Sequence, residues 1–174
     1  MAATEKQNIW AYASVGNVTP QTVIRKMKAT QGIYMAGCPF YINTDGTLTR
    51  ATTSDGTNDA FHCFARAGVT AQLAANTEIR VDLIRADILY AVYVENNDSD
   101  AAATQDLIGA AYGLRVSATA GKIGYVTVDV NNSNDTVKIV DIMPNIEGSM
   151  QTIATSPGIA IVQFLQGVID QELA

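Results

Sequence analysis

Charged residues are scarce in this 174-residue chain: they make up 16% of it, whereas hydrophobic residues make up 48%. Soluble domains carry about 25% charged residues, so we expect a surface that is poor in charge. Long hydrophobic runs are missing too, because none approaches the roughly 18 residues that a membrane-spanning helix needs. The opening residues MAATEKQNIW lack a basic stretch followed by an apolar one, so we expect no secretory signal. These shortages predict a soluble protein with no membrane partner, partly covered by its neighbours in an assembly.

Histidine and cysteine are nearly absent, which limits the chemistry open to the chain. There is one histidine, His62, and there are two cysteines, Cys38 and Cys63. A Ser-His-Asp or Cys-His system would have to use His62. Adjacent side chains on a strand point to opposite faces, so Cys63 lies out of its reach; Cys38 could approach from a neighbouring hairpin, but no motif requires it. We therefore predict a structural histidine, reduced and buried thiols, and no catalytic residue.

Metal and nucleotide motifs are missing as well. The cysteines and the histidine lack the paired spacing of a zinc site. Two acidic loops, beginning at Asp98 and Asp129, open like calcium loops but lack the glycine and the glutamate that such loops need. No glycine-rich phosphate-binding motif and no nucleophile-elbow motif occurs. We predict a protein that is not an enzyme, with no metal site and no cofactor.

The few charges are unevenly placed along the chain. Residues 1–30 hold four basic residues and one acidic residue, whereas the rest of the chain holds seven basic and sixteen acidic residues. The acidic remainder is a poor match for nucleic acid, whose binding depends on neutralising phosphates, so we expect no direct nucleic-acid partner. A basic stretch before an acidic body is typical of a docking arm, although a solvated tail with a few lysines would look the same.

The N-terminal stretch lacks clean periodicity. Pro20 restricts Thr19 to an extended conformation. Trp10 and Tyr12 are large apolar side chains in a polar stretch, where they would anchor the segment to its own body or to a partner. We predict an extended N-terminal arm over residues 1–30.

Short β-like runs separated by turns begin at residue 31. Residues 38–50 contain an Asp-Gly turn between two apolar runs and predict a hairpin. Residues 78–83 alternate polar and apolar side chains, which indicates a half-buried strand. Residues 88–94 form a short apolar run that fits a buried strand.

The second half of the chain continues this pattern. Residues 101–107 predict a short helix capped by Ser99 or Asp100. Residues 125–130 and 136–142 flank an Asn-rich turn and predict a second hairpin.

Many short strands with turn signals predict an all-β fold. We expect a small β-barrel or β-tulip-like body over residues 31–174, with at most one or two short helices. The body is either a single unit or two lobes, about 31–95 and 96–174. Residues 159–169 fit either a helix or a strand by their spacing, and no repeat of 20–50 residues is visible.

Six short segments form one series of strands and turns: Gly37–Leu48, Phe61–Gly68, Ile79–Ile84, Ile108–Leu114, Val126–Ile142 and Ile161–Leu165. This series resembles the capsid decoration proteins of tailed double-stranded DNA bacteriophages, also called cement or head-stabilising proteins. It extends over residues 33–170. The last segment favours a strand over residues 159–165.

The resemblance implies a structural protein of the virion without catalysis. Such proteins bind the outer surface of the expanded capsid, commonly as homotrimers, and stabilise the shell against internal DNA pressure. The implied partners are the major capsid protein and other copies of the chain. The implied location is the capsid exterior, after synthesis in the host cytoplasm. Some of these proteins use an N-terminal arm that adds a strand to the capsid protein, and the candidates for capsid contact here are Trp10, Tyr12, Arg25, Lys26 and Lys28.

A head-fibre or tail-fibre type of binding module is the alternative. Such a module would recognise a receptor or glycan through an aromatic-lined pocket. The tyrosines that could line it are Tyr34, Tyr41, Tyr90, Tyr93, Tyr112 and Tyr125. Several of them lie in predicted strands, where packing in the core is the commoner outcome.

Overall fold

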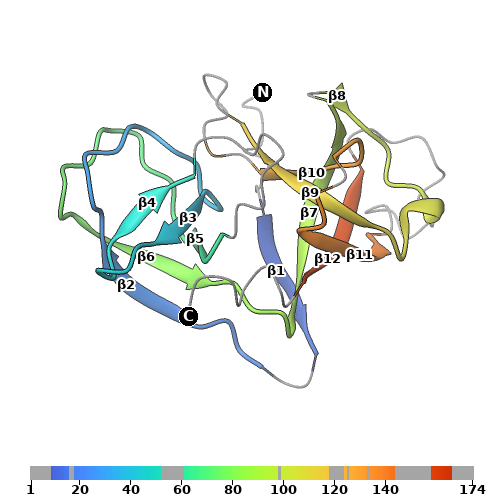
Figure 1. Ribbon diagram of the computed structural model, residues 1–174, viewed down its shortest axis with the longest axis horizontal. Helices are drawn as coiled ribbons and strands as arrows, with labels where there is room; N and C mark the ends of the chain where they lie inside the picture. The colour runs from blue at the N-terminus through green and yellow to red at the C-terminus, as the bar shows by residue number, and fades with distance from the viewer. Residues whose placement is uncertain are drawn as a thin grey trace, which may run out of the picture.

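The structure is nearly all β, as predicted (Figure 1). The computed structural model describes residues 9–15, 18–51, 61–97, 99–117, 124, 126–132, 134–143 and 158–165, with the side chain of Trp10 outside the described part. These residues form twelve β-strands and one short 3-10 helix, η1 (Gln105–Leu107). No helix among them is long and apolar enough to cross a membrane.

Ten of these strands form two five-stranded barrels. The first barrel consists of five strands that follow one another along the chain. They are β2 (Thr22–Lys26), β3 (Pro39–Ile42), β4 (Leu48–Arg50), β5 (Cys63–Ala65) and β6 (Glu78–Leu83). Hydrogen bonds join them in the order β2-β6-β5-β3-β4. The ring closes just beyond β2, where Met27 forms a parallel bridge with Leu48 and the Lys28 N–H donates to the Leu48 carbonyl over 2.9 Å. In this barrel β2 and β4 therefore meet at one end.

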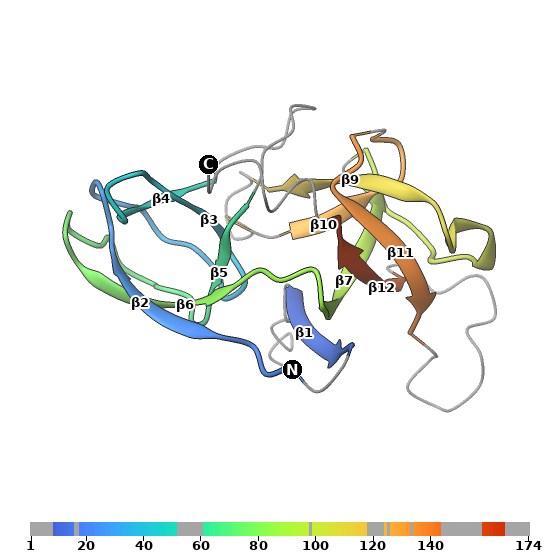
Figure 2. The same cartoon turned by 60° about the horizontal axis from the view of Figure 1, so that its bottom comes forward.

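The second barrel lies beside the first in both views (Figures 1 and 2). Its five strands are β7 (Ile88–Asn96), β9 (Ala111–Val116), β10 (Val126–Asp129), β11 (Val137–Ile142) and β12 (Ile159–Phe164). They pair in the order β7-β10-β9-β11-β12, and β12 pairs back onto β7 to close the ring. Two further strands pair with β7, namely β1 (Ile9–Ser14) and β8 (Ser99–Asp100).

The two barrels share one strand order. When the strands of each barrel are counted along the chain, the first pairs with the fifth, the fifth with the fourth, the fourth with the second and the second with the third, all antiparallel. The ring closes in both by a parallel contact between the third strand and the first. The chain is thus a tandem pair of barrels with the same topology, a repeat at the level of topology that the residue types do not reveal.

Alternation along β5 explains how the barrels are joined. Cys63 and Ala65 belong to the core of the first barrel, whereas Phe64 packs in the core of the second. The Phe64 ring lies 5.8 Å from the Tyr90 ring and 5.9 Å from the Phe164 ring, measured between centroids. Aromatic pairs at such distances attract one another beyond the burial of their area, so this cluster fastens one barrel to the other.

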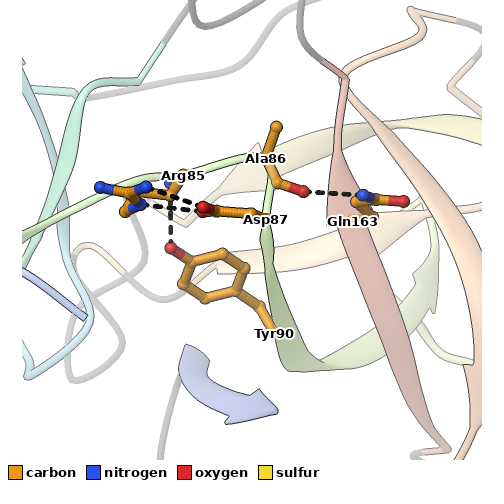
Figure 3. Close-up of polar contacts among 5 residues, drawn as sticks. All are labelled: Arg85, Ala86, Asp87, Tyr90 and Gln163. Atoms are coloured by element: carbon orange, nitrogen blue, oxygen red, sulfur yellow. Dashed lines mark hydrogen bonds and ion pairs between the residues drawn. The ribbon is translucent and has the colours of Figure 1, made fainter. Parts of the chain in front are cut away.

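The segment between β6 and β7 is held by side chains at both of its ends (Figure 3). Arg85 makes a two-pronged ion pair with Asp87 at 2.8 and 2.7 Å, and the Arg85 N–H donates to the Tyr90 hydroxyl at 3.2 Å. Gln163 of β12 donates to the Ala86 carbonyl at 2.7 Å. These bonds fix the connection between the barrels in one conformation.

Several predicted strands are confirmed. Strands β3 and β4 form the hairpin expected within residues 38–50. Strand β6 covers 78–83, and β7 contains 88–94. Residues 159–164 form β12, so the strand interpretation of this segment is correct and the helix interpretation is wrong there.

The hairpin predicted from residues 125–130 and 136–142 is wrong. Strands β10 and β11 occupy these positions, but β9 lies between them and pairs with both. Because both run antiparallel to β9, they run parallel to each other. Alternation identified the strands correctly, but it carries no information about which strands are neighbours.

The helix predicted over residues 101–107 is wrong in its start and its cap. Ser99 and Asp100 form β8, paired with the end of β7, so they are not available to cap a helix. The helical turn covers only Gln105–Leu107, and Thr104 precedes it without a side-chain cap.

The predicted arm also needs correction in its described part. Residues 9–14 form β1 and pair with β7, and residues 22–26 form β2 and pair with β6. Both strands are therefore integral to the sheets instead of a separate extended segment. The division into two lobes falls between β6 and β7, earlier than the predicted boundary at residue 95.

Candidate docking surface

Strand β1 exposes side chains while its backbone is anchored to the second barrel. It pairs with Ile88–Val92 of β7, and the register shifts at Tyr12, where the strand bulges. Tyr12 keeps 49% of its surface exposed. Trp10 contributes its backbone to this pairing, and its side chain lies outside the described part. Tyr12 is thus presented on a fixed strand.

Strand β2 carries the predicted basic contact residues. Arg25 and Lys26 lie within it, Lys28 follows two residues later, and all three are exposed. Ile24 stands between Val23, which packs on the core of the first barrel, and Arg25, and it is 53% exposed. We call Ile24, Arg25, Lys26 and Lys28 the β2 row. The structure gathers three of the five predicted contact residues in this row and places Trp10 and Tyr12 on another sheet.

A cavity of about 250 Å³ lies between β1 and the first barrel. Its lining includes Ile9 and Ala11 of β1, Tyr90 of β7, and Phe64 and Asp82 of the first barrel. The cavity therefore sits at the junction of the two barrels, next to the aromatic cluster that joins them.

Two polar residues that line this cavity, Arg66 and Asp82, are linked through Thr22. Arg66 donates to the Thr22 hydroxyl at 2.8 Å, and Thr22 donates to the Asp82 carboxylate at 2.5 Å. Arg66 also lies 3.9 Å from the same carboxylate, and 61% of its side chain is exposed. These groups satisfy one another, and they tie the start of β2 to β6.

His62 takes part in the fold of the first barrel. Its Nδ1 accepts a hydrogen bond from the Ile42 N–H at 2.7 Å, and its own backbone N–H donates to the Phe40 carbonyl at 3.0 Å. The ring also meets Tyr41 edge to face, with centroids 6.5 Å apart. These contacts hold the segment before β5 against β3.

Cys38 and Cys63 are both buried and unlinked, as predicted. Burial raises the pKa of each thiol to about 12. The thiolate is the reactive form of cysteine, so both side chains are protonated and inert at neutral pH.

Two acidic side chains of the second barrel are largely buried around an arginine. Glu95 and Asp129 face each other on β7 and β10. Arg115 Nε lies 3.5 Å from Glu95 Oε1, and its NH1 lies 4.0 Å from Asp129 Oδ2. Asp129 Oδ1 also accepts the Asn131 N–H at 3.0 Å, which shapes the turn after β10. In the part of the chain that is described, no group of three or more His, Cys, Asp or Glu side chains could hold a metal ion.

The tyrosines considered for an aromatic pocket are dispersed. Tyr34 and Tyr90 are buried in different core clusters. Tyr41, Tyr93 and Tyr112 are half-buried on three different strands. Tyr125 lies outside the described residues.

Ile24 is an exposed residue that no sequence motif identifies. The signal was present in the run Thr22–Lys26, because a strand that buries Val23 must turn Ile24 outward. An irregular arm, as predicted for residues 1–30, would have no such alternation of buried and exposed side chains.

Comparisons of the chain with known proteins identify no relative. No protein-family model, curated protein or solved structure matches it.

Proposed function

We propose that this chain is a structural virion protein that binds the outer surface of an expanded phage capsid and stabilises it against internal DNA pressure. In this role the chain acts as a homotrimer on the capsid exterior, with the major capsid protein as its partner. The alternation of strands and turns that resembles capsid decoration proteins supports this assignment.

The β2 row is the observation that carries the proposal. Three basic side chains and one apolar side chain are exposed together on a strand whose backbone is paired with β6. Side chains on an anchored strand have less freedom to lose on binding than those on a loose arm. The row is therefore suited to bind an acidic surface that carries an apolar contact at one end, opposite Ile24.

The joined barrels supply the stiffness that a stabilising protein needs. Phe64, Tyr90 and Phe164 fasten the barrels together, and the Arg85–Asp87 segment fixes their connection. A rigid body with contacts to more than one capsid subunit resists their separation. Many copies with modest individual contacts then act together, because each further contact on an assembled shell is an intramolecular event.

The test is to mix the purified protein with expanded, undecorated phage capsids. Occupancy is measured by cosedimentation, and resistance by the temperature at which the capsids release DNA. We expect saturable occupancy and a higher release temperature. An absence of saturable binding would contradict the proposal, and the mass of the free protein in solution separately tests the trimer.

A further inference from the structure

Within the described part of the chain, one edge of strand β2 pairs with no other strand over most of its length. The Met27 N–H donates to the carbonyl of Thr77, the residue before β6, at 3.0 Å, and the Gln21 carbonyl accepts from the Leu83 N–H at 2.9 Å. Odd-numbered residues of this strand therefore direct their backbone groups toward β6, and even-numbered residues direct theirs to the other edge.

On that other edge, the contact with β4 begins at the bridge between Met27 and Leu48, which also involves the backbone of Lys26 and Lys28. The Lys28 N–H reaches β4 at the point where the barrel closes. Among the described residues no strand pairs with this edge over Thr22–Ile24, so the N–H and C=O groups of Ile24 have no backbone partner there, although the Ile24 carbonyl accepts a long bond of 3.5 Å from the Arg25 guanidinium. An unpaired edge of this kind is a template for another strand.

The second barrel shows the same edge occupied. Strand β7 opens the second barrel as β2 opens the first. It meets the third strand of its barrel, β10, only near its C-terminal end, at 93–95, just as β2 meets β4 only at its end. Over Ile88–Val92 the remaining edge of β7 pairs with β1, which runs antiparallel to it. The bond from the Val15 N–H to the Asp87 carbonyl, 2.8 Å, continues this pairing. The strand order common to both barrels thus defines one strand position, which β1 occupies beside β7 and which no described strand occupies beside β2.

We propose that the open edge of β2 binds an extended, acidic segment of a partner protein as an added antiparallel strand. This inference rests on the proposed function only for the identity of the partner. The position and direction of the added strand come from the equivalence of β2 with β7.

The side chains along β2 select the chemistry of the added strand. The occupied position joins two uncharged partners, since neither Ile9–Ser14 nor Ile88–Val92 contains a charged residue. The open position instead presents Arg25, Lys26 and Lys28, all exposed. Opposite charges on neighbouring strands stabilise their pairing. The matching segment therefore carries acidic residues, with an apolar residue near Ile24.

Lysines on an edge strand can also serve to prevent unwanted pairing. That role predicts that no peptide adds to β2, whatever its charge. The binding experiment separates the two roles.

The probe is a short fluorescein-labelled peptide in which glutamate alternates with valine and threonine, and binding to the full chain is measured by fluorescence anisotropy. Ile24→Pro removes a single N–H that the fold does not use, and proline is tolerated on an open strand edge. Ile24→Val is the matched control, because it keeps the N–H and the apolar side chain. We expect the proline variant to bind about tenfold more weakly, equivalent to the loss of roughly one hydrogen bond, and the valine variant to bind like the wild type.

A second pair of probes keeps the test independent of how the proline variant folds. Peptides N-methylated on alternate residues block one edge of the added strand or the other. Methylation of the edge facing β2 should abolish binding to the wild-type protein, and methylation of the opposite edge should preserve it. No saturable binding, or binding indifferent to the methylated edge, would overturn the inference. Capsids play no part in these measurements, so their outcome is separable from that of the capsid assay.

Discussion

The contact between the barrels can be measured by replacing Phe64. This side chain is 5% exposed, and it leaves its own barrel to pack against Tyr90 and Phe164. Removal of a buried phenylalanine ring typically costs about 3–5 kcal/mol. A domain of ordinary stability has only about 5–15 kcal/mol in total. Phe64→Ala should therefore lower the free energy of unfolding by a large fraction of its value.

A double-mutant cycle isolates the part of this loss that comes from the contact itself. Phe64→Ala and Phe164→Ala are combined, and the free energy of unfolding is measured by urea denaturation followed by far-UV circular dichroism. An aromatic pair contributes about 0.5–1.5 kcal/mol beyond area burial, so we expect a coupling energy in that range. The control cycle combines Phe40→Ala with Phe164→Ala, because Phe40 is buried in the other core cluster. Its coupling with Phe164 should stay within about 0.5 kcal/mol of zero. Equal coupling in the two cycles would refute the account of how the barrels are joined.

Three further predictions concern the same junction and the buried thiols. Gly124 has a φ of +78° and a Cβ there would collide with the Cys38 side chain, so Gly124→Ala should cost at least about 2 kcal/mol; an unchanged melting temperature would contradict this. Gln163→Ala removes the bond to the Ala86 carbonyl and should cost about 1 kcal/mol, measured by urea denaturation. Burial raises the pKa of Cys38 and Cys63 to about 12, whereas thiols in the unfolded chain ionise near pH 8.5. Above pH 8.5 the unfolded chain is stabilised by ionisation of its thiols while the folded chain is not, so the free energy of unfolding should fall as the pH rises toward 12. A constant free energy of unfolding over this range would show that the thiols are not buried.

Local patterns in the sequence were sufficient for the strands that alternate cleanly or form tight turns. The Asp-Gly turn determined the hairpin of β3 and β4, and alternation determined β6. These signals are local, because they depend on side-chain period and turn conformation. The pairing of β10 and β11 with β9, in contrast, is fixed by contacts distant in sequence. No local pattern contains that information.

The N-terminal strands lack a clear local pattern for a related reason. Strand β2 alternates for only a few residues and exposes Ile24, Arg25 and Lys26, so it resembles an unstructured basic segment. Its order comes from pairing with β6, far along the chain. The predicted contact residues Arg25, Lys26 and Lys28 nevertheless lie exposed and together, because charged side chains in a strand must face solvent. The outward direction of these side chains was predictable, but their anchoring was not.

The pairing of β1 and β2 with other strands determines which variants can test docking. Deletion of residues 2–27 would remove β2 from the ring of the first barrel and β1 from its pairing with β7. Substitutions at exposed positions of the β2 row leave the backbone pairing intact. They are therefore the appropriate perturbation.

The most direct test of the central claim is the affinity of the triple variant Arg25→Gln, Lys26→Gln, Lys28→Gln for expanded, undecorated capsids. The matched control is Lys138→Gln, which removes an exposed lysine from β11 of the second barrel. Exposed ion pairs contribute up to about 1 kcal/mol each, so the triple variant should bind roughly tenfold or more weakly, with a smaller dependence on salt. The control should bind like the wild type. Equal affinity of the triple variant and the wild type would contradict docking through the β2 row.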